Sequence, residues 1–245
     1  RRYLLFNPIV KMKVTGQGEK VVALLHEIIA AKGFEQDTYF EMAIRDIGML
    51  PKLEGTEHVN MALIIKFVRN YFFDPQPYEE VGQMSRPADD GYLFTQKTGK
   101  LASVRFPDYR LAYRGVDSPN VKVFAEQVAL FRSLLITAPP SREQAANIDY
   151  MLAAGELFTL AVYAQLVLEN ARLYGVDGDI VEQIFTFLVK DFSAQALRMI
   201  IGQENSPAQE EIFRQMLRKP VADDEGWRRV WEVVFGHRDR YVMNE

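Results

Sequence analysis

The chain has 245 residues, of which 48% are hydrophobic and 25% are charged, which is the composition of a soluble globular protein of one or two domains. It contains no cysteine, which excludes disulfide frameworks, cysteine-ligated metal sites and a thiol nucleophile. Three histidines leave little for a histidine-rich metal site, and a net charge of -4 gives no general basis for binding nucleic acid. We therefore expect neither a metal nor a nucleic acid as a partner.

The start of the chain and its most apolar stretch bear on location. The chain opens on Arg1 without a methionine, so we expect a fragment, a processed form or the ordered part of something longer. The apolar run 3–10 is too short and too interrupted for a secretory signal. Residues 152–168 contain Glu156 and Gln165 and are too few for a membrane span, so they predict a core helix. The expected location is cytoplasmic.

Helical periodicity dominates residues 1–74. Apolar residues at three- and four-residue steps predict helices over 19–31, 37–47 and 56–72. Gly33 suits the end of the first helix, and the prolines that follow Asp74 end the third. These helices predict a first helical unit.

The next segment, 75–117, is rich in proline and glycine and shows no sustained helical period. We expect an irregular connection here, in which residues 91–94 and 102–106 are the candidates for short strands. Residues 118–245 predict a second helical unit, because capping signals return at Ser118-Pro119, Ser141…Gln144 and Ser206…Gln209. The expected helices cover 118–137, 141–175, 177 or 179 to 201, 206–218, and a last one from Asp223 or Asp224. The predicted fold class is all-α.

A pattern in residues 27–56 points to a family. The chain reads Glu27-Ile-Ile-Ala-Ala-Lys-Gly33-Phe34, then ten residues, then Arg45-Asp46, and later Leu53-Glu54-Gly55-Thr56. This resembles the carboxyl-terminal helical domain of the acyl-CoA dehydrogenases. That family has Gln-x-x-Gly-Gly-x-Gly-Phe/Tyr, about ten residues, Arg-Asp and, at a fixed interval, Tyr-Glu-Gly-Thr. The resemblance covers roughly residues 10–75 and implies a partial helical bundle of this type.

The resemblance assigns roles to residues 54–58. Glu54 falls on the catalytic base, which takes the α-proton of a fatty acyl-CoA while a hydride leaves the β-carbon for the flavin N5. Such a base works best in a desolvated pocket that raises its pKa toward neutrality. Gly55 permits close approach of the backbone to the substrate, and Thr56 and His58 fall where the family contacts FAD. In isolation, Glu-Gly-Thr is also a common helix start, with Thr56 as the N-cap.

Residues 27–33 match the segment that approaches the FAD pyrophosphate of a neighbouring subunit, which gives cofactor-binding candidates Glu27, Ala30, Ala31 and Gly33. Arg45 and Asp46 match a structural ion pair between helices. Two departures from the family pattern stand out: Ala30-Ala31 replaces Gly-Gly, and Glu27 replaces Gln and brings a negative charge toward phosphates. Either FAD sits differently here, or this subunit contributes less to it.

The second unit, 118–245, resembles in placement and helicity the domain that very-long-chain acyl-CoA dehydrogenases append, which helps to form dimers or contacts membranes. Trp227 and Trp231 are spaced as a packing face of the last helix. Arg228, Arg229 and the arginines beyond them could serve an anionic membrane surface, although a solvated helix face explains them more simply.

Two hypotheses follow from the resemblance. In the first, the chain is the carboxyl-terminal portion of a flavoenzyme of fatty acid metabolism that oxidises acyl-CoA to trans-2-enoyl-CoA and passes electrons to an electron-transfer flavoprotein. In the second, the chain is a non-enzymatic helical module that has lost flavin and acts by oligomerising. A homo-oligomer is expected in either case, and the chain alone is not expected to be a complete enzyme.

Overall fold

The computed structural model describes residues 1–53, 55–78, 91 and 99–240, and within these residues the regular structure is helical, without a strand. The all-α class is confirmed for this part of the chain. The chain divides into two compact units. Residues 3–64 with 223–245 are here called the hairpin unit, and residues 1–2 with 65–222 the bundle unit. This division falls inside the segment 1–74 that we expected to act as one domain.

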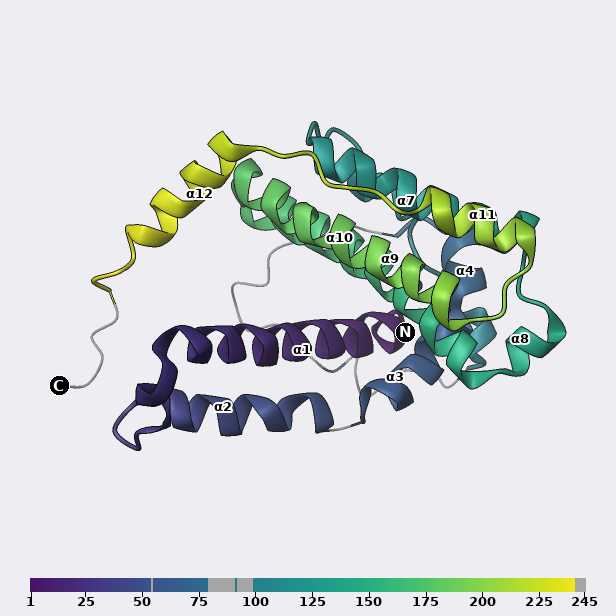
Figure 1. Cartoon of the computed structure of the whole chain (residues 1–245). Coiled ribbons are helices and arrows are strands. Elements are labelled where there is room, and N and C mark those ends of the chain that lie inside the picture. Colours follow the sequence, from purple (N-terminus) through teal and green to yellow (C-terminus); the bar gives the residue numbers. More distant parts are fainter. Residues whose placement is uncertain (54, 79–90, 92–98, 241–245) are drawn as a thin grey trace. The chain divides into compact units, whose positions relative to one another are not determined.

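In the hairpin unit, one long helix packs along two shorter ones: α1 (Tyr3–Ile29), α2 (Tyr39–Met49) and α3 (Glu57–Ile64) (Figure 1). Two 3-10 turns, η1 (Ala30–Phe34) and η2 (Leu50–Lys52), connect them. The helices α1 and α2 approach closely at Gly18, where an added Cβ would stand 3.1 Å from the Cδ1 atom of Ile47. A small residue at this position therefore sets the spacing of the hairpin.

The last helix, α12 (Asp224–Phe235), begins where the sequence predicts, because Asp223 Oδ1 accepts a hydrogen bond from the Gly226 amide at 2.9 Å. Nothing within the described part of the chain buries its two tryptophans completely. Trp227 and Trp231 are 51% and 54% exposed, so α12 carries an unpartnered apolar surface within the hairpin unit.

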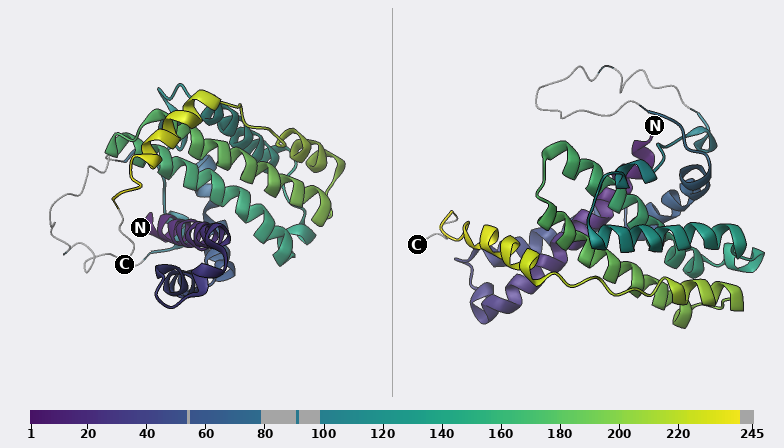
Figure 2. Two further views of the ribbon diagram at one scale, coloured as in Figure 1. Left: turned by 60° about the vertical axis from the view of Figure 1, so that its left-hand side comes forward. Right: turned by 90° about the horizontal axis from the view of Figure 1, so that it is seen from above.

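The bundle unit is built on four helices that lie side by side (Figures 1 and 2): α7 (Pro119–Thr137), α9 (Ile148–Tyr174), α10 (Gly178–Gly202) and α11 (Pro207–Gln215). The helix α10 packs against the other three. Phe124 contacts Phe185 and Phe192 edge to face, each at 5.5 Å between ring centroids, and all three are fully buried. Aromatic burial therefore accounts for much of this core.

Four shorter elements between residues 65 and 113 pack against α9 or against one another. They are η3 (Ile65–Phe67), α4 (Val68–Phe73), η4 (Leu101–Ser103) and α6 (Arg110–Tyr113). Tyr71 is buried there, stacked on Tyr109 at 5.6 Å, and its hydroxyl donates to Gln165 Oε1 at 2.5 Å. The described part of the connection 75–117 is thus packed into the bundle unit.

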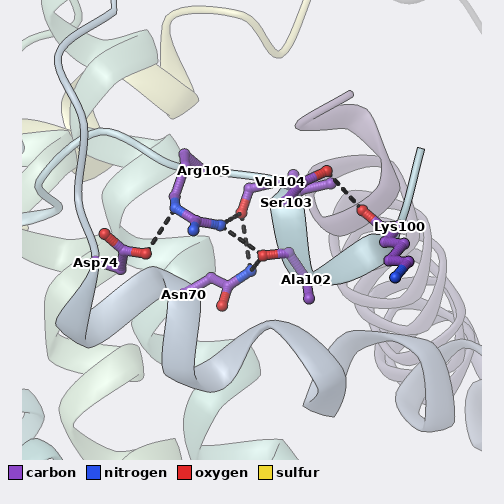
Figure 3. Close-up of polar contacts among 7 residues, drawn as sticks. All are labelled: Asn70, Asp74, Lys100, Ala102, Ser103, Val104 and Arg105. Atoms are coloured by element: carbon purple, nitrogen blue, oxygen red, sulfur yellow. Dashed lines mark hydrogen bonds and ion pairs between the residues drawn. The ribbon is translucent and has the colours of Figure 1, made fainter. Parts of the chain in front are cut away.

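The prediction of a short strand at residues 102–106 is wrong. Residues 101–103 form η4, and the residues after it form no strand: the carbonyl oxygen of Val104 accepts from a side chain (Figure 3), and that of Phe106 accepts from the backbone amide of Gln76 at 2.8 Å. Asn70 Nδ2 donates to the carbonyl oxygens of Ala102 at 3.2 Å and Val104 at 2.9 Å. Arg105 Nη1 also donates to the carbonyl oxygen of Ala102 at 2.6 Å, and its Nε pairs with Asp74 Oδ2 at 2.6 Å. Of the other candidate strand, 91–94, residues 92–94 lie outside the described residues.

Several helix ends differ from the predicted ones. α1 begins at Tyr3, includes Pro8, and ends at Ile29 because the next residue, Ala30, takes a left-handed backbone conformation with φ +56°. The helix expected over 56–72 is divided by η3, where Phe67 turns into the aromatic core of the bundle unit at 5.6 Å from Phe106. Tertiary packing overrides the helical pattern at this point.

The helix expected over 141–175 is also divided, into α8 (Arg142–Ala146) and α9, because Asn147 caps α9 by accepting from the amides of Asp149 and Tyr150. The two capping boxes predicted at Ser141 and Ser206 are confirmed. By length and composition, α9 is the one helix in the described residues that could cross a membrane. More than half of its apolar window is buried within the fold, as in the core helix that we expected.

Candidate functional site

The candidate site predicted from the sequence centres on the connection between α2 and α3. The sequence there is Leu50-Pro-Lys-Leu-Glu-Gly-Thr56, in which η2 is followed by a short turn before α3 begins at Glu57. Glu54, the predicted base, lies outside the described residues. Its neighbours Leu53 and Gly55 are described.

A lysine from α1 holds this connection on both sides of position 54. Lys11 Nζ donates to the carbonyl oxygen of Pro51 at 2.7 Å and to that of Gly55 at 2.7 Å. Asn60, on α3, donates to the same Gly55 oxygen at 3.1 Å through Nδ2. The connection is therefore fixed to α1 and to α3 at once, by charge-assisted and neutral hydrogen bonds.

Gly55 is at a position that requires glycine. Its φ is +103°, a conformation that L side chains rarely adopt, and an added Cβ would stand 3.4 Å from Asn60 Oδ1. The contact found is with Asn60, and the expected approach to a substrate stays a prediction.

The two cofactor candidates after Gly55 are open to solvent. Thr56 is exposed, and its carbonyl oxygen accepts from the amide of Asn60 at 3.1 Å. His58 is exposed in the first turn of α3. A hydroxyl and an imidazole near a helix start can each hydrogen-bond a polar ligand such as a flavin.

The second group of candidates, at residues 27–33, lies at the other end of the α1–α2 pair (Figure 1). Along α1, about 27 Å separates Lys11 from Ile29 at 1.5 Å per residue. Glu27, Ala30, Ala31 and Lys32 are all exposed. One copy of the hairpin unit therefore does not bring the two groups of candidates together.

Gly33 has a packing role. A Cβ at this position would stand 2.6 Å from His26 Cδ2 and 2.6 Å from Ile29 Cγ2, too close for any larger residue without a shift. The His26 ring in turn meets Phe34 edge to face at 4.3 Å. The residues present fit a cofactor only in part: the exposed segment from Ala30 to Lys32 is accessible, but Gly33 itself is buried.

The family ion pair is not formed as the resemblance implies. Arg45 and Asp46 are both exposed on α2, and their closest approach is 3.8 Å. Arg45 pairs better with Glu41, one turn earlier on the same helix, at 2.8 Å. Exposed pairs of this kind contribute little to stability, so within the hairpin unit Arg45 and Asp46 do not join two helices.

A separate polar cleft of about 570 Å³ lies in the bundle unit, where α8, α9 and α11 begin. Two glutamines cross it: Gln144 Nε2 donates to Gln209 Oε1 at 2.9 Å, and each glutamine also belongs to a capping box. Burial raises the pKa of Tyr150, on the cleft wall, to about 12.

Residues 1–53, 55–78, 91 and 99–240 contain no cluster of three or more His, Asp or Glu side chains that could hold a metal ion.

Sequence reasoning missed Lys11 and Asn60. Lys11 has a recognisable signal, since it is a cation within a helix whose neighbours Ile9 and Val10 are apolar. Its partners, however, are backbone oxygens 40 and 44 residues away, which no local pattern reveals. Comparison of the chain with protein-family models, with curated proteins and with solved structures gives no match.

Proposed function

We propose that this chain is the carboxyl-terminal portion of an FAD-dependent, acyl-CoA dehydrogenase-like protein whose substrate is a fatty acyl-CoA thioester. The observation that carries the proposal is the spacing from Gly33 through Arg45-Asp46 to Glu54-Gly55-Thr56. Two positions of this pattern lie in connections of the hairpin unit: Gly33 lies in η1, after α1, and residues 55–56 precede α3.

In the proposed reaction, the carboxylate of Glu54 removes a proton from the α-carbon of the acyl group. When bound, FAD supplies the acceptor for the hydride that leaves the β-carbon, so that a trans-2,3 double bond forms. The part of this chain is to hold the base: Lys11 and Asn60 fix the backbone beside it, and Gly55 provides the positive φ that this turn needs. Thr56 and His58 are available to orient the flavin.

An apolar stripe on α1 supports the idea that the hairpin is part of a larger bundle. Val14, Val21, Leu24 and Ile28 recur at helical spacing, and each is more than half exposed within the hairpin unit. Contiguous apolar surface of this kind is rarely left in water. Further helices of an acyl-CoA dehydrogenase bundle would cover it.

The separation of the two groups of cofactor candidates supports a shared site. Residues 55–58 and residues 27–33 lie at opposite ends of the hairpin, so they can serve one FAD only from two subunits. A homo-oligomer therefore belongs to the proposal, together with an electron-transfer flavoprotein as electron acceptor and a cytoplasmic location.

The rival function is a non-enzymatic helical module that oligomerises. The exposed apolar faces of α1 and α12 favour it, as does the negative charge of Glu27 where phosphates would approach. A visible absorption spectrum of the whole natural protein separates the two. The proposal predicts bound flavin, and bleaching of its absorbance when a long-chain acyl-CoA is added without oxygen. A colourless protein that assembles normally supports the rival.

A further inference from the structure

The polar cleft of the bundle unit, of about 570 Å³, has the size of a small-molecule site. The carboxylates of Glu143, Asp149 and Glu204 line it, and all three side chains are exposed. None of the three forms an ion pair with a lysine or arginine of the described residues. The residues that line the cleft, all of them described, include no lysine or arginine, and Arg142, next to Glu143 in the sequence, is not one of them. The cleft therefore presents negative charge, which disfavours anions and attracts cations.

The amide side chains in the wall of the cleft have already spent their N–H donors on the protein. Gln144 Nε2 donates to Gln209 Oε1 at 2.9 Å and to a backbone carbonyl oxygen at 2.7 Å. Gln209 Nε2 donates to two backbone carbonyl oxygens at 3.2 Å each, and Asn205 Nδ2 to two others at 2.6 and 3.1 Å. The Oδ1 atom of Asn205 is enclosed and has no donor. The wall therefore offers a ligand mainly acceptor oxygens.

A buried tyrosine in the same wall lacks a partner for its hydroxyl group. Tyr150 is 2% exposed, and its backbone amide donates to Asn147, but its hydroxyl group makes no hydrogen bond with the described residues. The hydroxyl oxygen is not one of the enclosed atoms without a partner, so it stays accessible from the cleft that Tyr150 lines. Buried polar groups nearly always have a partner. An unused hydroxyl in this wall therefore points to a ligand.

The three carboxylates do not converge on one point, since the part of the chain that the structure describes contains no group of three that could hold a metal ion. A single point charge does not satisfy them all, whereas a flexible chain with several ammonium groups can. We propose that the cleft binds an extended organic cation of the polyamine class, with its ammonium groups on separate carboxylates and one of them donating to the Tyr150 hydroxyl oxygen. This proposal does not depend on the acyl-CoA dehydrogenase function.

The test is isothermal titration calorimetry of the whole chain with the linear triamine spermidine, at low salt because salt screens exposed charges. Butylamine and Mg²⁺ are the reference ligands, and N-acetyl-trilysine amide, of equal charge, represents a lysine-rich segment of a protein. The double variant Asp149→Asn, Glu204→Gln removes two charges from the cleft. The control, Asp191→Asn with Glu126→Gln, makes the same change of net charge at exposed positions outside it. Tyr150→Phe removes the hydroxyl alone.

We expect one site that binds spermidine at least about tenfold more tightly than butylamine, and from which Mg²⁺ at equal charge does not displace it. The double variant weakens binding about tenfold, Tyr150→Phe about threefold to tenfold, and the control less than about twofold. Melting temperatures verify that the variants fold, and Glu204→Gln alone, in the connection before α11, serves if the double variant does not.

Three results overturn the proposal. Equal losses in the double variant and its control, or displacement of spermidine by Mg²⁺, show a general attraction of charge with no site. Binding that Tyr150→Phe leaves unchanged places the ligand away from the hydroxyl. If the trilysine peptide binds more tightly than spermidine and the double variant abolishes its binding, the cleft takes a lysine-bearing protein partner instead of a free polyamine.

Discussion

The carboxylate of Glu182 on α10 caps the beginning of α7 by accepting hydrogen bonds from the backbone amide of Asn120, at 3.1 Å to Oε1 and 3.2 Å to Oε2. The Asn120 side chain donates to the same carboxylate at 2.6 Å, and the Ser118 hydroxyl donates to it as well. A negative charge at a helix N-terminus is favourable. The expected N-cap, Ser118, therefore has its hydroxyl directed to Glu182 and makes no capping bond of its own.

Replacement of Glu182 should destabilise the bundle unit. Glu182→Ala leaves the buried Asn120 backbone amide without its acceptor and removes one of the acceptors of the Asn120 side chain, so we expect the free energy of unfolding to fall by about 3 kcal/mol. Urea denaturation measures it. Glu126→Ala is the control, because Glu126 is exposed on α7 and meets Arg218 only at 3.7 Å; its effect should stay within about 0.5 kcal/mol. Equal losses in the two variants would refute the capping role.

Ala30 and Ala31 should respond to glycine in opposite directions. Ala30 has φ +56°, a conformation that costs a non-glycine residue about 1–2 kcal/mol. Ala30→Gly relieves this cost. Glycine also raises the entropy of the unfolded chain, which opposes folding by about 0.4–1 kcal/mol, so we expect a net stabilisation of up to about 1 kcal/mol. Ala31 is not left-handed, and Ala31→Gly should destabilise by about 0.5–1 kcal/mol. Chemical denaturation of both variants measures the free energy of unfolding. If both variants are destabilised, the left-handed conformation of Ala30 is contradicted.

Buried tyrosines should make the fold sensitive to alkali. Burial raises the pKa of Tyr150 to about 12 and also raises the pKa values of Tyr71 and Tyr113. Between pH 10 and 12 the unfolded chain loses these protons while the folded chain keeps them, so the free energy of unfolding falls as pH rises. Tyr150→Phe should flatten this fall, whereas Phe at the exposed Tyr174 should not. Melting temperatures across this range test the difference; parallel curves would contradict it.

Local signals predicted much of the fold, and long-range contacts account for what they missed. The capping boxes at Ser141 and Ser206 each involve a glutamine three residues later, so the spacing in the sequence was sufficient to predict them. The cap of α7 depends on Glu182, more than sixty residues from Asn120, and no local pattern contains it. The break at Asn147 had a local signal, an asparagine that suits an N-cap, which the strong apolar period of α9 outweighed.

The candidate site divides in the same way. The positive φ of Gly55 explains why glycine stands there, and Thr56 and His58 are exposed, but their roles toward substrate and FAD stay predictions. The clamp by Lys11 could not be predicted, because it joins α1 to backbone atoms of a distant turn. That Gly33 is needed for packing against His26 likewise appears only when η1 folds back on the end of α1.

Assembly is the next expectation. The chain exposes apolar side chains on α12 as well as on α1, and we expect a two-fold dimer in which helices of the carboxyl-terminal part form or flank the interface. Light scattering at micromolar concentration should give twice the 28.2 kDa of one chain. A double Trp227→Ser, Trp231→Ser variant should dissociate at least about tenfold more readily, and Tyr174→Ser should not. A mass of one chain for the unmodified protein would rule the dimer out.

The role of Glu54 is tested most directly by Glu54→Gln in the whole natural protein, because the amide keeps the shape of the side chain and cannot accept the α-proton. The measurement is the rate of flavin bleaching after acyl-CoA is mixed with the protein in the absence of oxygen, with binding of acyl-CoA followed separately. The account predicts unchanged flavin content, retained binding of acyl-CoA, and a rate lower by a factor of about 10² to 10⁴. A Glu54→Gln protein that bleaches at close to the wild-type rate would contradict it.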